Sequence, residues 1–144
     1  MEWLAYLMKR NSPRLFWLIE RLARCMVKWR FESDLVVAER AARVTGHIEG
    51  LPAEMRALST QDTQALHDFL AGLPEDWLLH FQPHPFDPAG LQEILNSRAF
   101  LNYGLFAERD LVGYALLKVA PTGSAFNGLL VDPKFSGLGL GKFL

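Results

Sequence analysis

The sequence predicts an α/β fold: a mixed but mainly antiparallel sheet with flanking helices, preceded by an N-terminal helical extension. Residues 13–43 carry apolar side chains at helical spacing, whereas residues 100–131 contain three runs of β-forming residues joined by short polar connections. Short connections between strands imply antiparallel hairpins. The last apolar run leads into alternating glycines at residues 137–141, which is typical of a turn that follows a strand.

The N-terminal segment begins with a helix-start signal. The hydroxyl of Ser12 can accept a hydrogen bond from a free backbone N–H, and Pro13 suits the first helical position. The spacing predicts a helix over 13–30, followed by a weaker helical pattern over 31–43. The second pattern ends near Gly46, a residue that favours helix termination.

The helix over 13–30 is basic and amphipathic. Its apolar positions recur at steps of three and four residues, and its basic positions gather on another face. We interpret the apolar face as packing against the chain's own domain or against a second subunit, which makes a homo-oligomer a candidate assembly. Contact with a membrane surface or a partner protein is the alternative. The apolar positions are Leu15, Leu18, Ile19, Leu22, Met26 and Trp29, and the basic positions are Arg14, Arg21, Arg24 and Lys28.

The 144 residues carry a formal net charge of −1, which gives the whole chain no electrostatic reason to bind nucleic acid. The charge is unevenly distributed. Residues 1–30 contain seven basic and two acidic side chains, a net charge of +5, and the remainder contains eight and fourteen, a net charge of −6. We therefore divide the chain into a helical extension, residues 1–46, and a domain, residues 52–144, with a boundary at Gly46 to Pro52.

Cysteine usage and hydropathy indicate a cytoplasmic protein. Cys25 is the only cysteine, which excludes an intramolecular disulfide and a cysteine-based zinc site. We expect Cys25 to be buried in an apolar role; a thiol of lowered pKa in the basic helix is the alternative, but the sequence places no His or acidic partner for it. No apolar run approaches the ~18 to 20 residues that a membrane span requires, and the N-terminus lacks the basic start and small-residue cleavage site of a signal peptide.

The second part of the chain alternates between helical and strand patterns. Alternating apolar residues predict a short strand over 54–58, and the helical pattern that follows stops at Gly72 and Pro74. Residues 77–86 are rich in aromatic residues, histidine and proline, which indicates a structured loop, and a helix is predicted to follow over 87–97. The three β-type runs are residues 100–107, 111–119 and 126–131.

The glycine-rich run after the last predicted strand is the most informative segment. Gly137, Gly139 and Gly141 alternate with apolar residues. Glycines let backbone N–H groups converge on one point, and a helix N-terminus adds partial positive charge, so the segment predicts a diphosphate-binding loop. The dinucleotide fingerprint fails because its third glycine is missing. The P-loop fails because Ser136 and Phe143 replace its first glycine and its Ser/Thr.

The run from Val131 through Pro133 to Gly141 resembles motif A of the GNAT superfamily of N-acyltransferases. In that family the motif joins the fourth strand to the coenzyme-binding helix. The strand's backbone pairs with the pantetheine arm of acyl-CoA, and the amides that follow bind its pyrophosphate. The resemblance implies that Leu129, Leu130 and Val131 line the pantetheine and that Gly137, Leu138, Gly139, Leu140, Gly141 and Lys142 surround the pyrophosphate.

The resemblance covers about residues 52–144, and its specific part is the glycine loop. Weaker matches occur upstream in the family's order, in the first strand, the proline-rich loop and the third strand. Two features depart from the family pattern. Ser136 stands where Gln or Arg is usual, and only three residues follow Gly141, too few for a stable coenzyme-binding helix. We therefore expect a C-terminally incomplete domain, truncated after motif A, that is weak or inactive by itself.

Acyl transfer to an amine requires a deprotonated nucleophile, a polarised thioester carbonyl and a proton for the departing thiolate. By resemblance, the backbone N–H near Leu130 is the candidate that polarises the carbonyl. No side chain stands out as the base, since Asn127 on the last strand cannot take up a proton at neutral pH. His84 is a candidate on the substrate side or as the base, with ordinary hydrogen bonding as the simpler interpretation. His80 and His84 would bind a metal only on a helix, which Pro83 opposes, so no metal site is predicted.

The resemblance implies an N-acyltransferase, most simply an N-acetyltransferase, that uses acetyl-CoA or another acyl-CoA. The implied acceptor is a small-molecule amine or a protein amino group. The alternative is a catalytically incomplete GNAT-like module that acts in CoA binding or in protein interaction.

Overall fold

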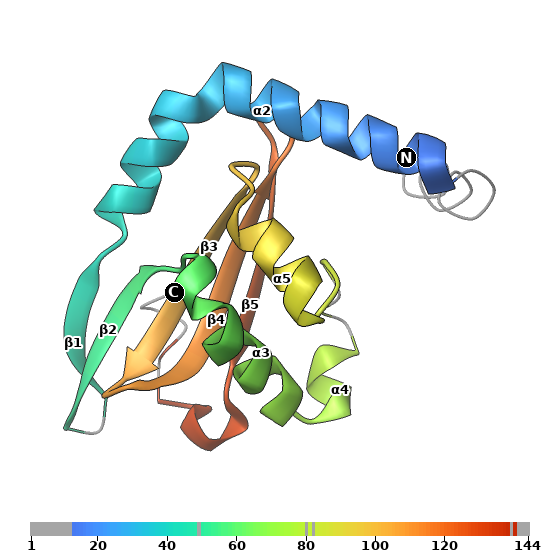
Figure 1. Ribbon diagram of the computed structural model, residues 1–144. Coiled ribbons are helices and arrows are strands. Elements are labelled where there is room, and N and C mark those ends of the chain that lie inside the picture. The colour runs from blue at the N-terminus through green and yellow to red at the C-terminus, as the bar shows by residue number, and fades with distance from the viewer. Residues whose placement is uncertain (1–12, 49, 80, 82, 139, 141–144) are drawn as a thin grey trace.

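The computed structural model shows helices packed on a five-stranded antiparallel sheet, with a long helix at the N-terminal side (Figure 1). This confirms the predicted fold class. No helix in the described part of the chain is both long and apolar enough to cross a membrane. The structure describes residues 13–48, 50–79, 81, 83–138 and 140.

One continuous helix, α2 (Pro13–Ala41), replaces the two helical patterns that the sequence predicted. It continues through residues 31–41 because neither glycine nor proline interrupts it there. A strand that was not predicted, β1 (Val44–Ile48), follows and pairs with the next strand in the chain. Residues 44–48 are therefore part of the sheet, and the predicted boundary at 46–52 falls within a hairpin.

The sheet has the order β1-β2-β3-β4-β5, and every neighbouring pair is antiparallel. Strands adjacent in the chain are adjacent in the sheet, and the short connections predicted between the three C-terminal strands are present. The three C-terminal strands are confirmed, and the strand predicted over 54–58 is part of a longer one. The strands after β1 are β2 (Leu51–Ala57), β3 (Phe100–Ala107), β4 (Asp110–Val119) and β5 (Ala125–Val131).

The helices between β2 and β3 build the main core against one face of the sheet (Figure 1). α3 (Thr63–Gly72) ends and α5 (Pro88–Leu95) begins as predicted. The short α4 (Glu75–Leu78) was not predicted, and it overlaps the start of the segment predicted as a loop, residues 77–86. Leu66 on α3 and Leu91 on α5 are completely buried. Burial of such side chains is the main favourable contribution to folding.

α2 crosses one end of the sheet and reaches the same core through one side of the helix (Figure 1). Val27 and Leu35 are 1% and 5% exposed, and Phe31 packs beside them. The predicted apolar stripe lies elsewhere, so the interpretation that it packs on its own domain is wrong. Spacing identifies residues that share a face, but not the face that the domain covers. The residues of the predicted stripe are all exposed, namely Leu15, Leu18, Ile19, Leu22, Met26 and Trp29. Cys25 is exposed as well, so the expectation that it is buried is wrong.

The opposite face of the sheet carries a smaller apolar cluster. Met55, Leu105 and Val112 are buried in it, one from each of three neighbouring strands. Leu140, in the segment after β5, covers this cluster and is 2% exposed. The cluster therefore attaches the glycine-rich segment to the sheet.

A partly buried ion pair fixes the end of β2 to the start of α3. The carboxylate of Asp62 accepts from Nη1 and Nη2 of Arg56 at 3.0 and 2.6 Å, and from the backbone N–H of Ser59 at 2.8 Å. Burial raises the pKa of Asp62, but the hydrogen bonds from Arg56 and Ser59 outweigh burial, so the net pKa is lowered. The ionised carboxylate is therefore stabilised in the folded state.

Asp62→Asn is expected to lower the free energy of unfolding by about 1 to 2 kcal/mol at neutral pH, because it weakens a charged pair and a helix cap. The folded carboxyl has a lowered pKa. Its contribution is therefore present above the unfolded pKa of about 3.9 and is lost as pH falls through the folded value. Urea unfolding at about pH 7 and about pH 3 measures both effects.

Asp68→Asn provides the matched control, since it removes the same charge from an exposed position on α3. A change within about 0.5 kcal/mol is expected for it. Equal losses for the two variants would contradict a specific role for Asp62.

Candidate functional site

β5 pairs with β4 alone among the described strands, so its other edge is open. The ladder between β4 and β5 is regular along its length. At one end the N–H of Ala120 donates to Ser124 O at 2.8 Å, and at the other the N–H of Asp132 donates to Val112 O at 2.9 Å. Hydrogen-bonded pairs alternate along an antiparallel ladder. The even-numbered residues of β5 therefore direct their N–H and C=O groups at β4, and the odd-numbered residues direct theirs at the open edge.

This alternation decides which amides of β5 are accessible to a ligand. The N–H groups of Leu129 and Val131 point to the open edge, whereas that of Leu130 lies within the ladder, opposite Tyr114. The candidate for carbonyl polarisation therefore moves from Leu130 to one of its two neighbours. The side chains follow the same alternation, since Leu130 is 5% exposed in the main core and Leu129 is 46% exposed.

The glycine-rich segment leaves the sheet directly after β5. It begins with a short 3-10 helix, η2 (Pro133–Phe135), capped by Asp132, whose carboxylate accepts from the backbone N–H of Lys134 at 2.9 Å. Gly137 follows with a φ of +84°, a conformation that favours glycine. Apart from its chain neighbours, no heavy atom lies within 4 Å of the position that a Cβ would take. The backbone of Gly137 is therefore open to a ligand.

The structure describes part of the predicted pyrophosphate loop. Leu138 is 39% exposed, whereas Leu140 is buried against the sheet. The loop is thus anchored at residue 140, while residues 137 and 138 are exposed. The other predicted members, Gly139, Gly141 and Lys142, lie outside the described residues.

A hollow of about 390 Å³ lies beside this loop, between the start of β4 and η2. Its charged lining is mostly acidic, with Glu108, Asp110 and Asp132 against Lys134. Because like charges repel, the hollow is a poor site for a pyrophosphate. An anionic ligand is expected instead at the exposed backbone of Gly137.

The loop between α4 and α5 covers β5 on the helical side of the sheet. Phe81 is 7% exposed, and its ring lies so close to Gly128 that a Cβ there would collide with it. The ring stacks with that of Phe86, with centroids 6.5 Å apart, and meets Tyr114 edge to face at 6.0 Å. Gly128 is therefore the position that lets this loop approach the strand.

His84 joins the same loop to the sheet through buried hydrogen bonds. Its Nδ1 lies 2.9 Å from Pro85 O, and its Nε2 lies 3.0 Å from the hydroxyl of Tyr114, which donates to Asn102 Oδ1 at 2.8 Å. Burial lowers the pKa of His84, although the hydrogen bond with Pro85 acts in the opposite direction. Burial also raises the pKa of Tyr114. Both side chains are therefore held in their neutral forms.

The hydrogen-bond network of His84, Tyr114 and Asn102 contains fewer protons than acceptor atoms. A neutral His84 that donates from Nδ1 to Pro85 O can only accept at Nε2, so the single hydroxyl proton of Tyr114 serves either His84 Nε2 or Asn102 Oδ1 at one time. Both ring nitrogens of His84 are engaged, which favours ordinary hydrogen bonding over a role as base. Tyr114 was not predicted as a site residue from the sequence, although strand alternation on β4 places it on the same face as the buried Leu116.

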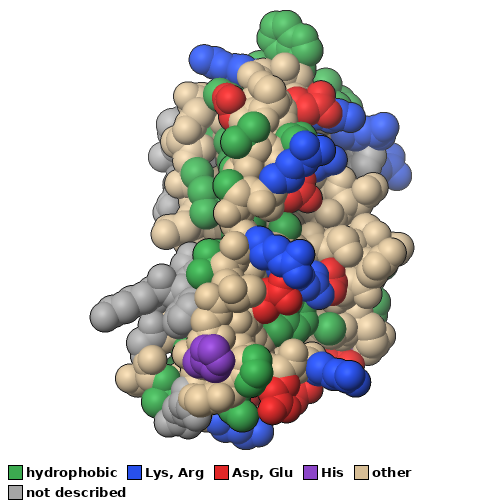
Figure 2. All heavy atoms as spheres, turned by 90° about the vertical axis from the view of Figure 1, so that its left-hand side faces the viewer, with side chains coloured by type: hydrophobic (Ala, Val, Ile, Leu, Met, Phe, Trp, Pro, Cys, Tyr) green, Lys and Arg blue, Asp and Glu red, His purple; other side chains and the backbone are tan. Residues whose placement is uncertain are grey.

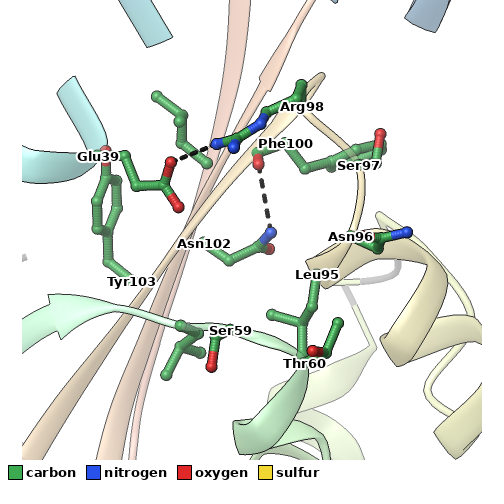
Figure 3. Close-up of a pocket in the computed structure, with 12 residues that line it drawn as sticks. Glu39, Ser59, Thr60, Leu95, Asn96, Ser97, Arg98, Phe100, Asn102 and Tyr103 are labelled. Carbon is green, nitrogen blue, oxygen red and sulfur yellow. Dashed lines mark hydrogen bonds and ion pairs between the residues drawn. The ribbon is translucent and has the colours of Figure 1, made fainter. Parts of the chain in front are cut away.

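A second cavity, of about 210 Å³, lies at the other end of the sheet (Figure 3). It is lined by residues 100–103 at the start of β3, whereas the glycine loop lies beyond the end of that strand. Arg98 donates to Glu39 of α2 at 2.5 Å across its rim, and Asn102 forms part of its wall. The described residues contain no group of three His, Cys, Asp or Glu side chains suited to a metal ion.

The free energy of unfolding is expected to fall as the pH is lowered from about 7 to about 5. The folded pKa of His84 is lowered, so the unfolded chain, with a pKa of about 6.5, takes up the proton first. His84→Gln removes this titration, and its free energy of unfolding should fall less on acidification. Urea unfolding at both pH values measures the difference. The control, His67→Gln on α3, should keep the parent pH dependence, and an unchanged slope in His84→Gln would refute this account.

Comparisons with known proteins bear on the fold. No family model matches the sequence, and a search of curated proteins finds no significant match. Among solved structures, the GNAT domain of S. lividans PAT superposes with a TM-score of 0.54 over 67% of this chain and 64% of its own, at 11% identity. An aminoglycoside acetyltransferase from an uncultured soil metagenomic sample gives a TM-score of 0.50 over 67% of this chain and 66% of its own, at 20% identity.

The ribosomal-protein-alanine N-acetyltransferase of Brucella melitensis biovar Abortus 2308 gives a TM-score of 0.47 at 21% identity, over 62% of this chain and 64% of its own. The chain thus spans less than two thirds of the length of each of these structures. At such identities, structural likeness establishes the fold. The antiparallel sheet with its flanking helices is the fold of the GNAT acetyltransferases.

Proposed function

We propose that this chain binds acyl-CoA along the open edge of β5 and transfers the acyl group to an amine. The observation that carries the proposal is the run of open backbone groups from Leu129 and Val131 to Gly137, at the edge of a sheet with the GNAT fold. An extended chain that contains amides can add to such an edge as an extra strand does. The donor is acetyl-CoA or another acyl-CoA, and the acceptor is a small-molecule amine or a protein amino group.

The glycine loop provides the place for the diphosphate in this proposal. Gly137 and Leu138 are exposed just beyond the end of β5, and the positive φ of Gly137 is a conformation that favours glycine. Backbone N–H groups in such turns bind anions without a side-chain charge. The acidic side chains that line the hollow beside the loop disfavour binding of the diphosphate there.

In this proposal the backbone of β5 has one catalytic role, which is to polarise the thioester carbonyl. Acyl-CoA supplies a thioester, whose carbonyl carbon is attacked by the amine. The C–N bond forms, the C–S bond breaks, and CoA leaves as the thiol with the proton that the amine loses. The N–H of Leu129 or Val131 donates to the carbonyl oxygen, and this hydrogen bond strengthens as negative charge develops there. Leu130, buried and bonded to β4, holds both amides in position. Donors fixed in a regular ladder need no reorganisation during the reaction.

We also propose that residues 52–144 form the acyl-CoA-binding domain and that residues 1–46 are an extension with its own contact surface. The strand β1 attaches the extension to the sheet, and the exposed apolar side of residues 13–30 is available to a second copy, a partner or a membrane. A cytoplasmic location agrees with a single cysteine, Cys25, that has no partner for an intramolecular disulfide.

Gly137→Asp is expected to raise the dissociation constant for CoA at least about tenfold, because it places an anion beside the diphosphate. Isothermal titration calorimetry with CoA measures the change. Gly123→Asp is the matched control, since Gly123 has a similar φ of +89° but lies in the turn at the other end of β5. Unchanged affinity in the Gly137 variant, or equal losses of affinity in both variants, would show that this loop does not bind the diphosphate.

Leu129→Pro removes an N–H that takes no part in the ladder, and proline is tolerated on an open edge. We expect the rate at which this variant acylates a panel of amines with acetyl-CoA to fall about 100-fold. The rate is measured by the release of the CoA thiol. Asn127→Pro removes the preceding outward N–H and serves as the control for strand distortion. Equal activities in the two variants would exclude Leu129 as the carbonyl donor. CoA binding without thiol release in the parent chain would favour the incomplete binding module.

A further inference from the structure

α2 has a second apolar side that the domain leaves uncovered. One side of the helix reaches the core through Val27, Phe31 and Leu35. The other side forms an outer stripe within about 100° of the helix circumference and about 21 Å long. Exposed apolar patches of this kind mark interaction surfaces. The outer stripe consists of Leu15, Leu18, Ile19, Leu22, Met26 and Trp29, and it includes a tryptophan that is 87% exposed.

The outer stripe is bordered by basic side chains. Arg14, Arg21 and Lys28 are exposed and follow one another at seven-residue intervals, which places them along one border. Arg30 lies near the other border, where its guanidinium is within 5.2 Å of the ring centre of Phe31. The stripe therefore combines apolar area with positive charge on both sides.

The single acid within residues 13–31 is turned toward the domain. Glu20 accepts from Lys118 of β4 at 3.0 Å and from Arg24 at 3.2 Å. Burial raises the pKa of Glu20, but Lys118 and Arg24 outweigh burial, so the net pKa is lowered and the charge is retained. Because Glu20 pairs with Lys118 and Arg24 on the side that faces the domain, no carboxylate from residues 13–31 neutralises the basic borders of the outer stripe.

Other parts of the surface carry balanced charge. Figure 2 shows the side formed by β1 and the C-terminal half of α2, where basic and acidic side chains lie next to one another. Arg43 pairs with Glu54 at 2.7 Å there, and Arg98 pairs with Glu39 at 2.5 Å. Within residues 13–31, by contrast, every exposed charged side chain is basic.

We propose that the outer stripe binds the surface of an anionic lipid bilayer, with its apolar side chains at the headgroup boundary and its basic borders against the headgroups. An amphipathic helix with Leu and Trp on one face and Arg and Lys beside it lies in the plane of such an interface. Each basic residue near an anionic surface adds to the attraction. A second copy would bring two sets of basic borders together, so charge favours the lipid surface over self-association.

This arrangement leaves the candidate acyl-CoA edge accessible from water. α2 contacts the turn between β4 and β5, where Arg30 donates to Pro121 O at 3.3 Å and the ring of Phe31 lies 3.5 Å from the position of a Cβ on Gly123. The glycine loop leaves the opposite end of β5. The lipid surface and the coenzyme loop therefore lie at opposite ends of one strand, and the lipid contact does not depend on acyl transfer.

Co-sedimentation of the full chain with vesicles tests the proposal. Vesicles of phosphatidylcholine containing phosphatidylglycerol should bind the protein, added salt should weaken binding, and vesicles of phosphatidylcholine alone should bind poorly. Leu22→Gln should weaken binding about tenfold, and Lys28→Glu about tenfold to thirtyfold. The controls Leu79→Gln and Arg109→Glu make the same changes at exposed positions outside α2 and should bind as the parent chain does.

Because all four positions are exposed, each variant should retain the parent melting temperature, which verifies folding. Absence of binding to the anionic vesicles, or equal binding to both kinds of vesicle, would overturn the proposal. Equal losses in the stripe variants and their controls would overturn it too. Light scattering that shows a dimer dissolved by Leu22→Gln, without vesicle binding, would assign the outer stripe to a second copy instead.

Discussion

The ladder between β4 and β5 is the constraint on which the rest of the structure depends. It runs from the turn at Gly123 to the end of β5 without a bulge, so each hydrogen bond fixes the direction of the next. It places Tyr114 opposite Leu130, beneath the loop between α4 and α5. It also directs the amides of Leu129 and Val131 to the open edge. The core, the covering loop and the candidate coenzyme edge are therefore all positioned by one strand pairing.

An open edge strand is a liability, because its unpaired N–H and C=O groups can template pairing with another chain. Proteins usually protect such edges with charge, proline or a bulge, and β5 contains none of these. Phe126 and Leu129 on β5 are 56% and 46% exposed. The exposed apolar edge of β5 is accounted for if a ligand with amide groups pairs with its free backbone groups. The same feature that favours association in the absence of a ligand would provide the binding energy for one.

The parts of the fold that were predictable are those fixed by local chemistry. Alternation and turn residues located β3, β4 and β5, and Gly72 with Pro74 ended α3 as expected. β1 was missed because Gly46 and His47 interrupt any apolar alternation, so only its pairing with β2 makes it a strand. The outer stripe was assigned to the wrong side for a related reason. The inner side of α2 is held partly by charged contacts of Glu20, which a search for apolar spacing does not detect.

The direction of the backbone amides of β5 is the part of the candidate site that could not be predicted from the sequence. Motif spacing located the glycine loop and the strand before it, but it could not decide between Leu130 and its neighbours as the source of the open amide. That choice depends on the parity of the ladder, which is set where Ala120 and Ser124 close the turn. One residue more in this turn would reverse which amides of β5 face β4 and would also move Leu130 out of the core. Because burial of Leu130 opposes such a shift, the packing of the core selects the backbone groups that are left for the ligand.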